Sequence, residues 1–345
     1  MNDIQKLVPW TKEQASAFGC RAIKARHCLA DFELFSDEAL TTLLESHPRE
    51  ALQAFTMGSD VTQRSDWQPV DTSGATAADL LKSASHGRLW FNIHHVQQFH
   101  SAYRDITDRV FAELREMCPG FQPLNCDVTL IISSPAALVY YHADAQPNLL
   151  WHLRGHKRIW IYPEGVRKFI AQELMEDIFA SFADEEAAYT PDFDHRATQF
   201  DVSPGDVICW PQNAPHRVTN LEGLNVSLST VFQTEASERR KLTYCANRLF
   251  RRTYHIPLWS TKETGMAAGL KRTAFRAFRK MGWVHTPPRR AYIAKLRIDP
   301  LAPSGCSPVA GDSVLTEFSR KDFMLQKDEL GTIVLRQQEY HRSAK

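Results

Sequence analysis

Two short stretches that set polar residues among apolar ones constrain the fold of this chain more than any other feature. The first, LVYYHADAQPNLLWHLRGHKRIWIYP, runs from Leu138 to Pro163 and places His142 and Asp144 two residues apart. Alternate residues of a β-strand point to the same face of the sheet. The spacing therefore predicts that both side chains share one face of a strand.

The second stretch, GDVICWPQNAPH, runs from Gly205 to His216. It opens with a Gly-Asp turn, continues as an apolar strand and ends with a histidine beyond a proline-bounded loop. A double-stranded β-helix needs this arrangement, because its far strand has to return beside the H-x-D strand. An isolated H-x-D pair is commonly a chance pairing, but the two stretches together predict that His142, Asp144 and His216 converge.

Two imidazoles and one carboxylate suit a first-row divalent metal ion. As a facial set they leave three coordination positions open for oxygen and an organic cosubstrate, which is the logic of a non-haem Fe(II) oxygenase. Another group of histidines, His94, His95 and His100, lies near the start of a predicted helix. Histidines at such a place are more often solvated or hydrogen-bonded, so we do not predict a second metal site.

These motifs resemble those of the JmjC and cupin-like 2-oxoglutarate oxygenases, with the pattern of the asparaginyl hydroxylase factor-inhibiting HIF and its bacterial relatives as the nearest. The resemblance rests on the H-x-D pair, on GHKRIWIYP from Gly155 to Pro163 and on SPGDVICWPQNAPH from Ser203 to His216. It covers residues 85–235 and implies a mainly β fold with flanking helices around a double-stranded β-helix (jelly-roll, cupin-like) core. It also implies that His142, Asp144 and His216 are the ligands of Fe(II).

The resemblance further implies how 2-oxoglutarate is bound as a cosubstrate. Lys157 stands where the family places the lysine that pairs with the distal carboxylate, and Asn148 matches a family asparagine near the same molecule. Just before the H-x-D pair the family often has a threonine, whereas this chain has Val139 and Tyr140. Tyr140 and Thr129 are the candidates for the missing hydroxyl group.

The residues themselves leave the direction of Lys157 open. Lys157 shares one face of a predicted strand, residues 157–162, with two isoleucines. We expect this strand to form a hairpin with residues 149–154 about Gly155 and His156. A lysine among isoleucines is costly to bury without a partner, so an inward Lys157 implies an anion. The alternative is a lysine at a strand end in solvent.

The chain is predicted to divide into an N-terminal scaffold region, residues 1–84, a catalytic domain, residues 85–235, and a basic helical C-terminal region with a tail, residues 236–345. A helix is expected to start at Ser36 and to bury Leu40, Leu43 and Leu44. The loop over residues 59–76 is interpreted as a connector rather than a lid, and the acidic run over residues 184–194 as a solvated face. Other helices are predicted over residues 77–85, 96–117 and 166–182, and strands over 21–35, 89–93, 127–132, 136–142 and 225–232.

Two basic helices are predicted beyond Phe232, with clustered arginines and lysines: Arg239, Arg240, Lys241, Arg248, Arg251, Arg252, Lys271, Arg272, Arg276, Arg279 and Lys280. Aromatic residues are sparse there and no nucleic-acid motif accompanies them. We therefore expect these helices to pack against the β-helix and to form a homodimer, as in the asparaginyl hydroxylase relatives, rather than to bind nucleic acid.

Composition narrows the class of protein. The 345 residues carry a formal net charge of +1, with 43% hydrophobic and 23% charged residues, as in ordinary globular proteins. Seven cysteines without a C-x-x-C pair indicate reduced thiols and a cytoplasmic protein. No apolar stretch approaches the roughly 18 residues of a transmembrane helix.

The predicted activity is hydroxylation of a C–H bond with release of succinate and CO2. Two other interpretations stay open: a cupin-like metal protein with a non-oxygenase reaction, and a metal-free binding or regulatory module. Because function lies in the site and not in the architecture, the substrate can be a protein, a peptide or a small molecule.

Overall fold

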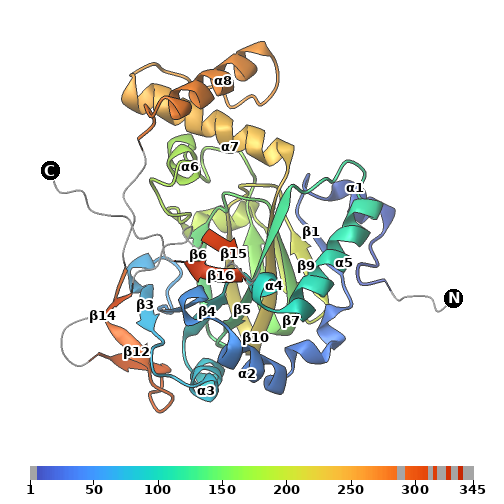
Figure 1. Ribbon diagram of the computed structural model, residues 1–345, viewed down its shortest axis with the longest axis vertical. Helices are drawn as coiled ribbons and strands as arrows, with labels where there is room; N and C mark the ends of the chain where they lie inside the picture. The colour runs from blue at the N-terminus through green and yellow to red at the C-terminus, as the bar shows by residue number, and fades with distance from the viewer. Residues whose placement is uncertain (1–5, 286–291, 310–313, 317–323, 328–332, 337–345) are drawn as a thin grey trace.

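The computed structural model describes residues 6–285, 292–309, 314–316, 324–327 and 333–336 (Figure 1). Within these residues one 12-stranded sheet dominates, with strand order β1-β9-β7-β10-β5-β4-β2-β3-β12-β13, while β6 pairs with β10 and β8 with β7. Its strands are β1 Ile23–Arg26, β2 Leu52–Thr56, β3 Gln68–Asp71, β4 Leu89–Ile93, β5 Asn125–Ser133, β6 Leu138–His142, β7 Asn148–Ile161, β8 Thr198–Val202, β9 Asp206–Cys209, β10 His216–Gln233, β12 Leu296–Ile298 and β13 Cys306–Pro308. Two small pairs stand apart, β11 Tyr292–Ala294 with β14 Val314–Thr316 and β15 Met324–Lys327 with β16 Ile333–Arg336.

Helices flank this sheet in two groups (Figure 1). The first group comes from the N-terminal half of the chain: α1 Lys12–Ala17, α2 Asp37–Ser46, α3 Ala77–His86, α4 Val96–Phe99 and α5 Ser101–Met117. The second group, at the top of Figure 1, is α6 Gln172–Phe179, α7 Glu235–Arg248 and α8 Met266–Lys280. Short helical turns lie at Leu29–Asp31, Glu33–Phe35, Arg49–Ala51, Arg64–Asp66, Pro191–Arg196 and Leu249–Thr253. None of the helices described combines the length and apolarity that crossing a bilayer requires.

The long strands β7 and β10 run through both halves of the double-stranded β-helix. Residues 148–154 of β7 pair with residues 226–231 of β10, and residues 156–161 of β7 pair with residues 216–222 of β10. β9 pairs with the first half of β7, and β8 pairs with its second half. The predicted mainly β fold, with a double-stranded β-helix core and flanking helices, is confirmed.

The predicted hairpin about Gly155 and His156 is wrong. Its two arms do not pair with each other, because each pairs with a different half of β10, and β7 continues through both residues as one strand. A left-handed residue, Gly155 with φ of +77°, sits where the register of the pair shifts. The glycine marks an irregularity of a long strand, and not the turn of a hairpin.

Replacing Gly155 with alanine is expected to destabilise the fold by about 2–5 kcal/mol. A side chain in the left-handed region costs roughly 1–2 kcal/mol, and overpacking adds about 1–3 kcal/mol. The new Cβ would lie 2.7 Å from Asn225 Nδ2 and 2.9 Å from the Leu224 carbonyl oxygen. Gly19→Ala is the control, because Gly19 has φ of +72° but open space around it. Urea unfolding of both variants checks the difference, and equal losses would contradict the steric argument.

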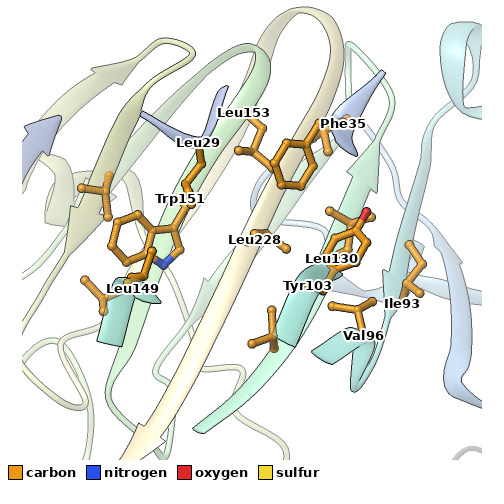
Figure 2. Close-up of a cluster of buried hydrophobic side chains, with 14 of the residues drawn as sticks. Leu29, Phe35, Ile93, Val96, Tyr103, Leu130, Leu149, Trp151, Leu153 and Leu228 are labelled. Atoms are coloured by element: carbon orange, nitrogen blue, oxygen red, sulfur yellow. The ribbon is translucent and has the colours of Figure 1, made fainter. Parts of the chain in front are cut away.

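One face of the barrel strands forms the main core against the helices. Figure 2 shows Trp151 of β7, Leu228 of β10 and Leu130 of β5 packed with Tyr103 of α5. The alternate residues of the same strands, among them Leu150, Thr129 and Ser229, point the other way and line a cavity. Side chains that alternate along these strands thus lie in the core on one face of the sheet and on the cavity wall on the other.

Several local predictions are confirmed, and others are wrong in their bounds or in the type of element. Ser36 caps α2, whose leucines at 40, 43 and 44 are buried, and α3 and β4 lie where they were predicted. The predicted strand over residues 21–35 ends at Arg26 and gives way to two helical turns. The predicted helix over 96–117 is interrupted at His100, whose backbone is extended. The predicted helix over 166–182 is confined to α6, and the predicted loop over 59–76 contains β3, which pairs with β2 and with β12.

The acidic run over residues 184–194 is a solvated face only in part: Asp192 is 68% exposed, but other carboxylates of the run are bound within the chain. Asp194 accepts hydrogen bonds from Tyr162 and Tyr189 and pairs with the buried Arg217. Glu186 pairs with Arg64 across 2.9 Å. Carboxylates of this segment, which lies between β7 and β8, therefore attach it to β10 and to the turn at Arg64. No local pattern in the sequence reveals these partners.

The C-terminal helices were predicted to pack against the β-helix, but their main partner is α6, in the segment between β7 and β8. Phe275 of α8 and Leu242 of α7 share one apolar cluster with Ile178 of α6. Basic residues of this region pair with acidic residues of α6, as in the ion pairs Arg248–Asp177 and Arg251–Glu176. Much of the positive charge is thus neutralised within the chain.

Candidate metal centre

The structure brings His142, Asp144 and His216 together, with one ligand atom of each within 4.8 Å of the others. His142 is the last residue of β6 and faces His216, the first residue of β10, in register. Asp144 lies beyond the end of β6, so the prediction that it shares a strand face with His142 is wrong in detail. The loop after β6, rather than the strand, carries the carboxylate.

The geometry of the three side chains leaves room for an ion between them. His142 Nε2 is 3.7 Å from Asp144 Oδ1, and His216 Nε2 is 3.6 Å from Asp144 Oδ2. These distances are too long for hydrogen bonds. Two atoms that each bind one ion at roughly 2.0–2.2 Å lie about 3–4 Å apart. The donor set therefore fits a divalent metal ion.

Hydrogen bonds at the other ring nitrogens orient both imidazoles. His142 Nδ1 lies 2.8 Å from the Tyr140 carbonyl oxygen, and His216 Nδ1 lies 3.0 Å from that of Ala214. A carbonyl oxygen only accepts, so each Nδ1 carries the proton and each Nε2 offers its lone pair to a metal. Burial, and next the neighbouring His142, hold the pKa of His216 well below its usual value of 6.5. His216 is therefore neutral and able to bind a metal at pH 7.

A cavity of about 580 Å³ opens onto these three residues. Its volume suits a small organic molecule together with part of a substrate. The apolar residues of its wall are largely aromatic and include Phe55, Met57, Trp67, Trp90, Tyr140 and Trp210. Its polar residues include Asn92, His94, Asp127, Thr129, Asn148 and Ser229.

The candidate cosubstrate residues on the cavity wall have defined partners. Asn148 accepts a hydrogen bond from Ser229 Oγ at 3.0 Å, and Thr129 Oγ1 lies 3.1 Å from His94 Nδ1. The Tyr140 hydroxyl accepts from the backbone N–H of Gly58 at 3.2 Å. All three candidates thus face the cavity from different elements, and each retains an oxygen that can accept or donate further.

Lys157 points inward, which settles the alternative that the sequence left open. Its side chain is 1% exposed, and its Nζ lies 5.9 Å from the centre of the Trp90 ring on the cavity wall. No carboxylate of the described residues pairs with the Lys157 ammonium group. Burial lowers the pKa of Lys157 from 10.5 to about 7. A buried cation of this kind suits an anion that arrives from outside the chain.

The histidines that flank α4 have hydrogen-bond or ring partners in the structure. His95 pairs with Asp127, His94 lies between Gln53 and Thr129, and His100 contacts His47. These histidines are hydrogen-bonded, as expected for a helix start. Sequence reasoning missed two residues beside the metal centre, Gln212 and Asn213, because neither is of a ligand type and only the tertiary contacts reveal them.

A double-stranded β-helix with two histidines and a carboxylate where two strands meet defines a cupin-like metal centre. The family model described as a cupin-like domain matches residues 75–238, and so confirms the predicted cupin-like family for this part of the chain. Comparison with curated protein sequences found no match.

Two solved structures similar to this chain are of YcfD from Escherichia coli. The X-ray structure of YcfD has 14% sequence identity over 79% of this chain and 68% of YcfD, with a TM-score of 0.48. The structure of YcfD described as a ribosomal oxygenase in complex with cobalt and 2-oxoglutarate has 14% identity over 80% of this chain and 68% of YcfD, with a TM-score of 0.46.

Proposed function

We propose that this chain is an Fe(II)- and 2-oxoglutarate-dependent oxygenase that hydroxylates a C–H bond of a protein, peptide or small-molecule substrate. The observation that carries the proposal is the buried Lys157, whose Nζ lies 5.9 Å from the ring of Trp90, on the wall of the same cavity that His142, Asp144 and His216 line. A buried lysine without a carboxylate partner among the described residues calls for an anionic ligand such as a dicarboxylate, which a metal centre by itself does not require. The donor set alone would fit either class of protein.

Each part of the site has a role in this proposal. His142, Asp144 and His216 would hold Fe(II), which when bound supplies oxygen activation coupled to decarboxylation of 2-oxoglutarate. Lys157 would pair with the distal carboxylate of the cosubstrate, while Asn148 and the hydroxyl of Thr129 or Tyr140 would provide further hydrogen bonds. The aromatic residues of the cavity wall would exclude water from the reacting atoms.

Succinate release tests this function. Purified protein with Fe(II) and 2-oxoglutarate is incubated with peptides and metabolites, and succinate is measured with and without each candidate. We expect basal succinate formation that a substrate stimulates. Saturable Fe(II) binding without any 2-oxoglutarate binding would instead identify a cupin with a different reaction, and absence of metal binding would identify a binding module.

We also propose that the C-terminal helices form a homodimer. The helix α8 exposes an apolar row on one face, with Met266 at 93% and Leu270 at 73% exposure, and Met281 exposed beyond its end. Contiguous exposed apolar surface of this kind marks an interaction site. A second copy of the helix would cover it through a two-fold contact.

Leu270→Glu is expected to convert this dimer to a monomer without loss of the fold, because it places a charge in the middle of the apolar row. Sedimentation velocity at micromolar concentration checks the oligomeric state, and circular dichroism checks the fold. Thr273→Glu, on the same helix at an exposed position, serves as a test of whether the face extends along α8. A wild-type chain that sediments as a monomer defeats this proposal.

A further inference from the structure

Asp144 lies beyond the end of β6, whose last residue is His142, so contacts outside the β6 ladder position its loop. Its neighbours in the chain are held instead by other parts of the molecule. The backbone N–H of Ala143 donates to the Glu185 carbonyl oxygen at 2.9 Å, and that of Ala145 donates to Glu185 Oε1 at 3.1 Å. These contacts attach one side of the Asp144 loop to the acidic run.

The other side of the loop is attached to the segment that leads into His216. The side-chain amide of Asn213 donates to the Asp144 carbonyl oxygen at 2.7 Å, and that of Gln212 donates to the Ala145 carbonyl oxygen at 2.9 Å. Asn213 is 6% exposed and has φ of +66°. Asparagine tolerates this left-handed conformation better than most residues. The turn between β9 and β10 therefore aims an amide donor at the backbone of a metal ligand.

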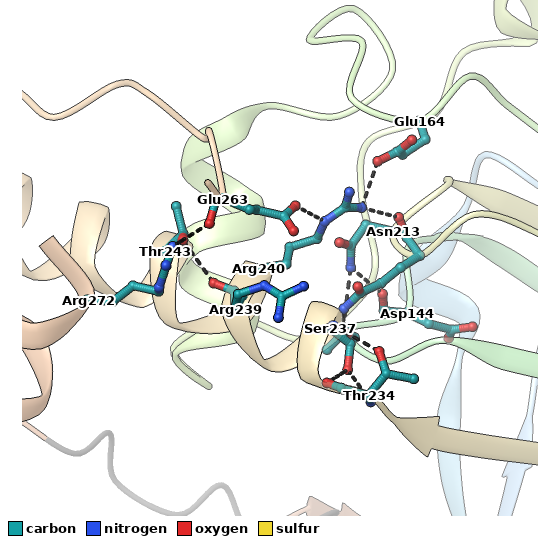
Figure 3. A network of polar contacts seen from close by, with 12 residues as sticks. Asp144, Glu164, Asn213, Thr234, Ser237, Arg239, Arg240, Thr243, Glu263 and Arg272 are labelled. Atoms are coloured by element: carbon teal, nitrogen blue, oxygen red, sulfur yellow. Dashed lines mark hydrogen bonds and ion pairs between the residues drawn. The ribbon is translucent and has the colours of Figure 1, made fainter. Parts of the chain in front are cut away.

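The C-terminal helix α7 holds this turn in place (Figure 3). Arg240 of α7 donates to the Gln212 carbonyl oxygen at 3.0 Å, while its guanidinium pairs with Glu164 and Glu263 at 2.6 Å each. Ala143, between the two ligands of the H-x-D pair, belongs to the apolar cluster of α6, α7 and α8. The loop that carries Asp144 thus contacts the C-terminal helices directly through Ala143. Its polar connection to Arg240 of α7 passes through Gln212.

We infer that Asn213, together with Gln212, is a positioning residue of the metal centre, which sets the distance between Asp144 and His216. This inference rests on the proposed metal-binding function. Asn213 touches no reacting atom, and it acts by fixing the backbone of one ligand relative to the strand that delivers another. Loss of partners that orient metal ligands typically weakens metal binding by about 10- to 100-fold.

The test is Co(II) binding to the full-length chain, followed by titration and by the visible ligand-field absorption of the bound ion. Asn213→Gly removes the amide and keeps the left-handed backbone unstrained. We expect a dissociation constant raised by about 10- to 100-fold and an altered Co(II) spectrum, because the Asp144 carboxylate is no longer held. A merely structural role would lower the melting temperature and leave the spectrum unchanged.

Asn225→Gly is the matched control. Asn225 is fully buried, and its amide likewise donates to two backbone carbonyls, those of Glu222 and Gly223, but neither belongs to a metal ligand or its neighbour. This variant is expected to lose stability and to keep the wild-type affinity and spectrum. If Asn213→Gly does not fold, Gln212→Met tests the same contact set, with a several-fold loss of affinity expected.

The outcomes separate this inference from the proposed function. Wild-type chain that binds no Co(II) overturns the metal centre itself. Wild-type chain that binds Co(II), with Asn213→Gly or Gln212→Met equal to Asn225→Gly in affinity and spectrum, overturns only the positioning role.

Discussion

We expect Asp144→Ala to abolish stoichiometric metal binding and to leave the fold intact. Asp144 supplies the one carboxylate of the candidate centre, and its two oxygens lie 3.7 Å from His142 Nε2 and 3.6 Å from His216 Nε2. Two neutral imidazoles remain in the variant, so the ion loses both a ligand and its negative counter-charge. The affinity for the metal ion is expected to fall by more than about 100-fold, since loss of a residue that only hydrogen-bonds to a ligand already lowers metal affinity by about 10- to 100-fold.

Metal content after anaerobic loading with Fe(II), together with circular dichroism, checks this prediction. Asp127→Ala is the matched control, because Asp127 is another carboxylate on the wall of the same cavity but pairs with His95. The control is expected to bind Fe(II) as the wild type does. An Asp144→Ala protein with one iron per chain and full turnover would show that the carboxylate is not a ligand.

The parts of the site that the sequence predicts are those set by short-range patterns. The H-x-D pair places His142 at the end of a strand whose alternation is visible in the sequence, and the proline-bounded turn delivers His216 to the start of another. Both histidines then meet because β6 and β10 pair in register. The identity of the donor set requires only residue types and this one pairing.

The errors of prediction lie where long-range pairing decides the structure. Gly155 and His156 look like a hairpin turn, yet β7 continues because β10 offers a partner to both of its halves, more than fifty residues further along the chain. In the same way β3 looks like part of a loop, and it becomes a strand between β2, twelve residues before it, and β12, from the C-terminal part of the chain. Local propensity cannot report a partner at that separation in sequence.

The sequence does not predict the burial and the partners of charged residues, for a related reason. Asp194 looks solvated within an acidic run, but its partner Arg217 lies on β10 beside a metal ligand. Lys157 has no decisive sign in the sequence either, because a strand lysine can face either way. Its burial follows from the position of β7 between β10 and β8, which only the assembled sheet fixes.

Replacing Lys157 with methionine is expected to stabilise the chain in the absence of ligands. Methionine has a similar length and no charge, so it removes the cost of burying an ammonium group. Burial lowers the pKa of Lys157 from 10.5 in its usual environment to about 7 in the folded chain. Above about pH 10.5 the amine is neutral in both states, and as pH falls toward 7 the unfolded chain gains a proton that the folded chain does not.

The stability advantage of Lys157→Met over wild type should therefore grow as pH falls from about 10.5 to about 7, and stay constant below that range. Urea unfolding of both proteins at several pH values measures it. Lys241→Met is the control, since Lys241 is a lysine on the cavity wall whose side chain is 40% exposed. A stability difference that does not change with pH would contradict the burial of a titrating amine.

The same substitution is expected to destroy binding of 2-oxoglutarate while Fe(II) is retained. If Lys157 pairs with the distal carboxylate, its loss leaves that carboxylate buried without a partner, at a cost of about 3–5 kcal/mol. This corresponds to a loss of affinity of roughly 10²- to 10⁴-fold. Lys157→Arg is expected to restore binding only in part, because the planar guanidinium differs in shape from a compact ammonium group.

Anaerobic titration of the Fe(II)-loaded chain with 2-oxoglutarate, followed by the visible metal-to-cosubstrate charge-transfer band, measures this binding. In the wild type a bound dicarboxylate stabilises the protonated amine, so binding takes up a proton above pH 7 and the affinity falls by up to about ten-fold per pH unit there. Lys157→Met should lack this dependence, because no amine remains at that position to take up the proton. A wild-type chain that binds Fe(II) but shows neither the band nor saturable 2-oxoglutarate binding would overturn the oxygenase proposal. Such a chain would keep the metal centre and use its buried lysine for another anion.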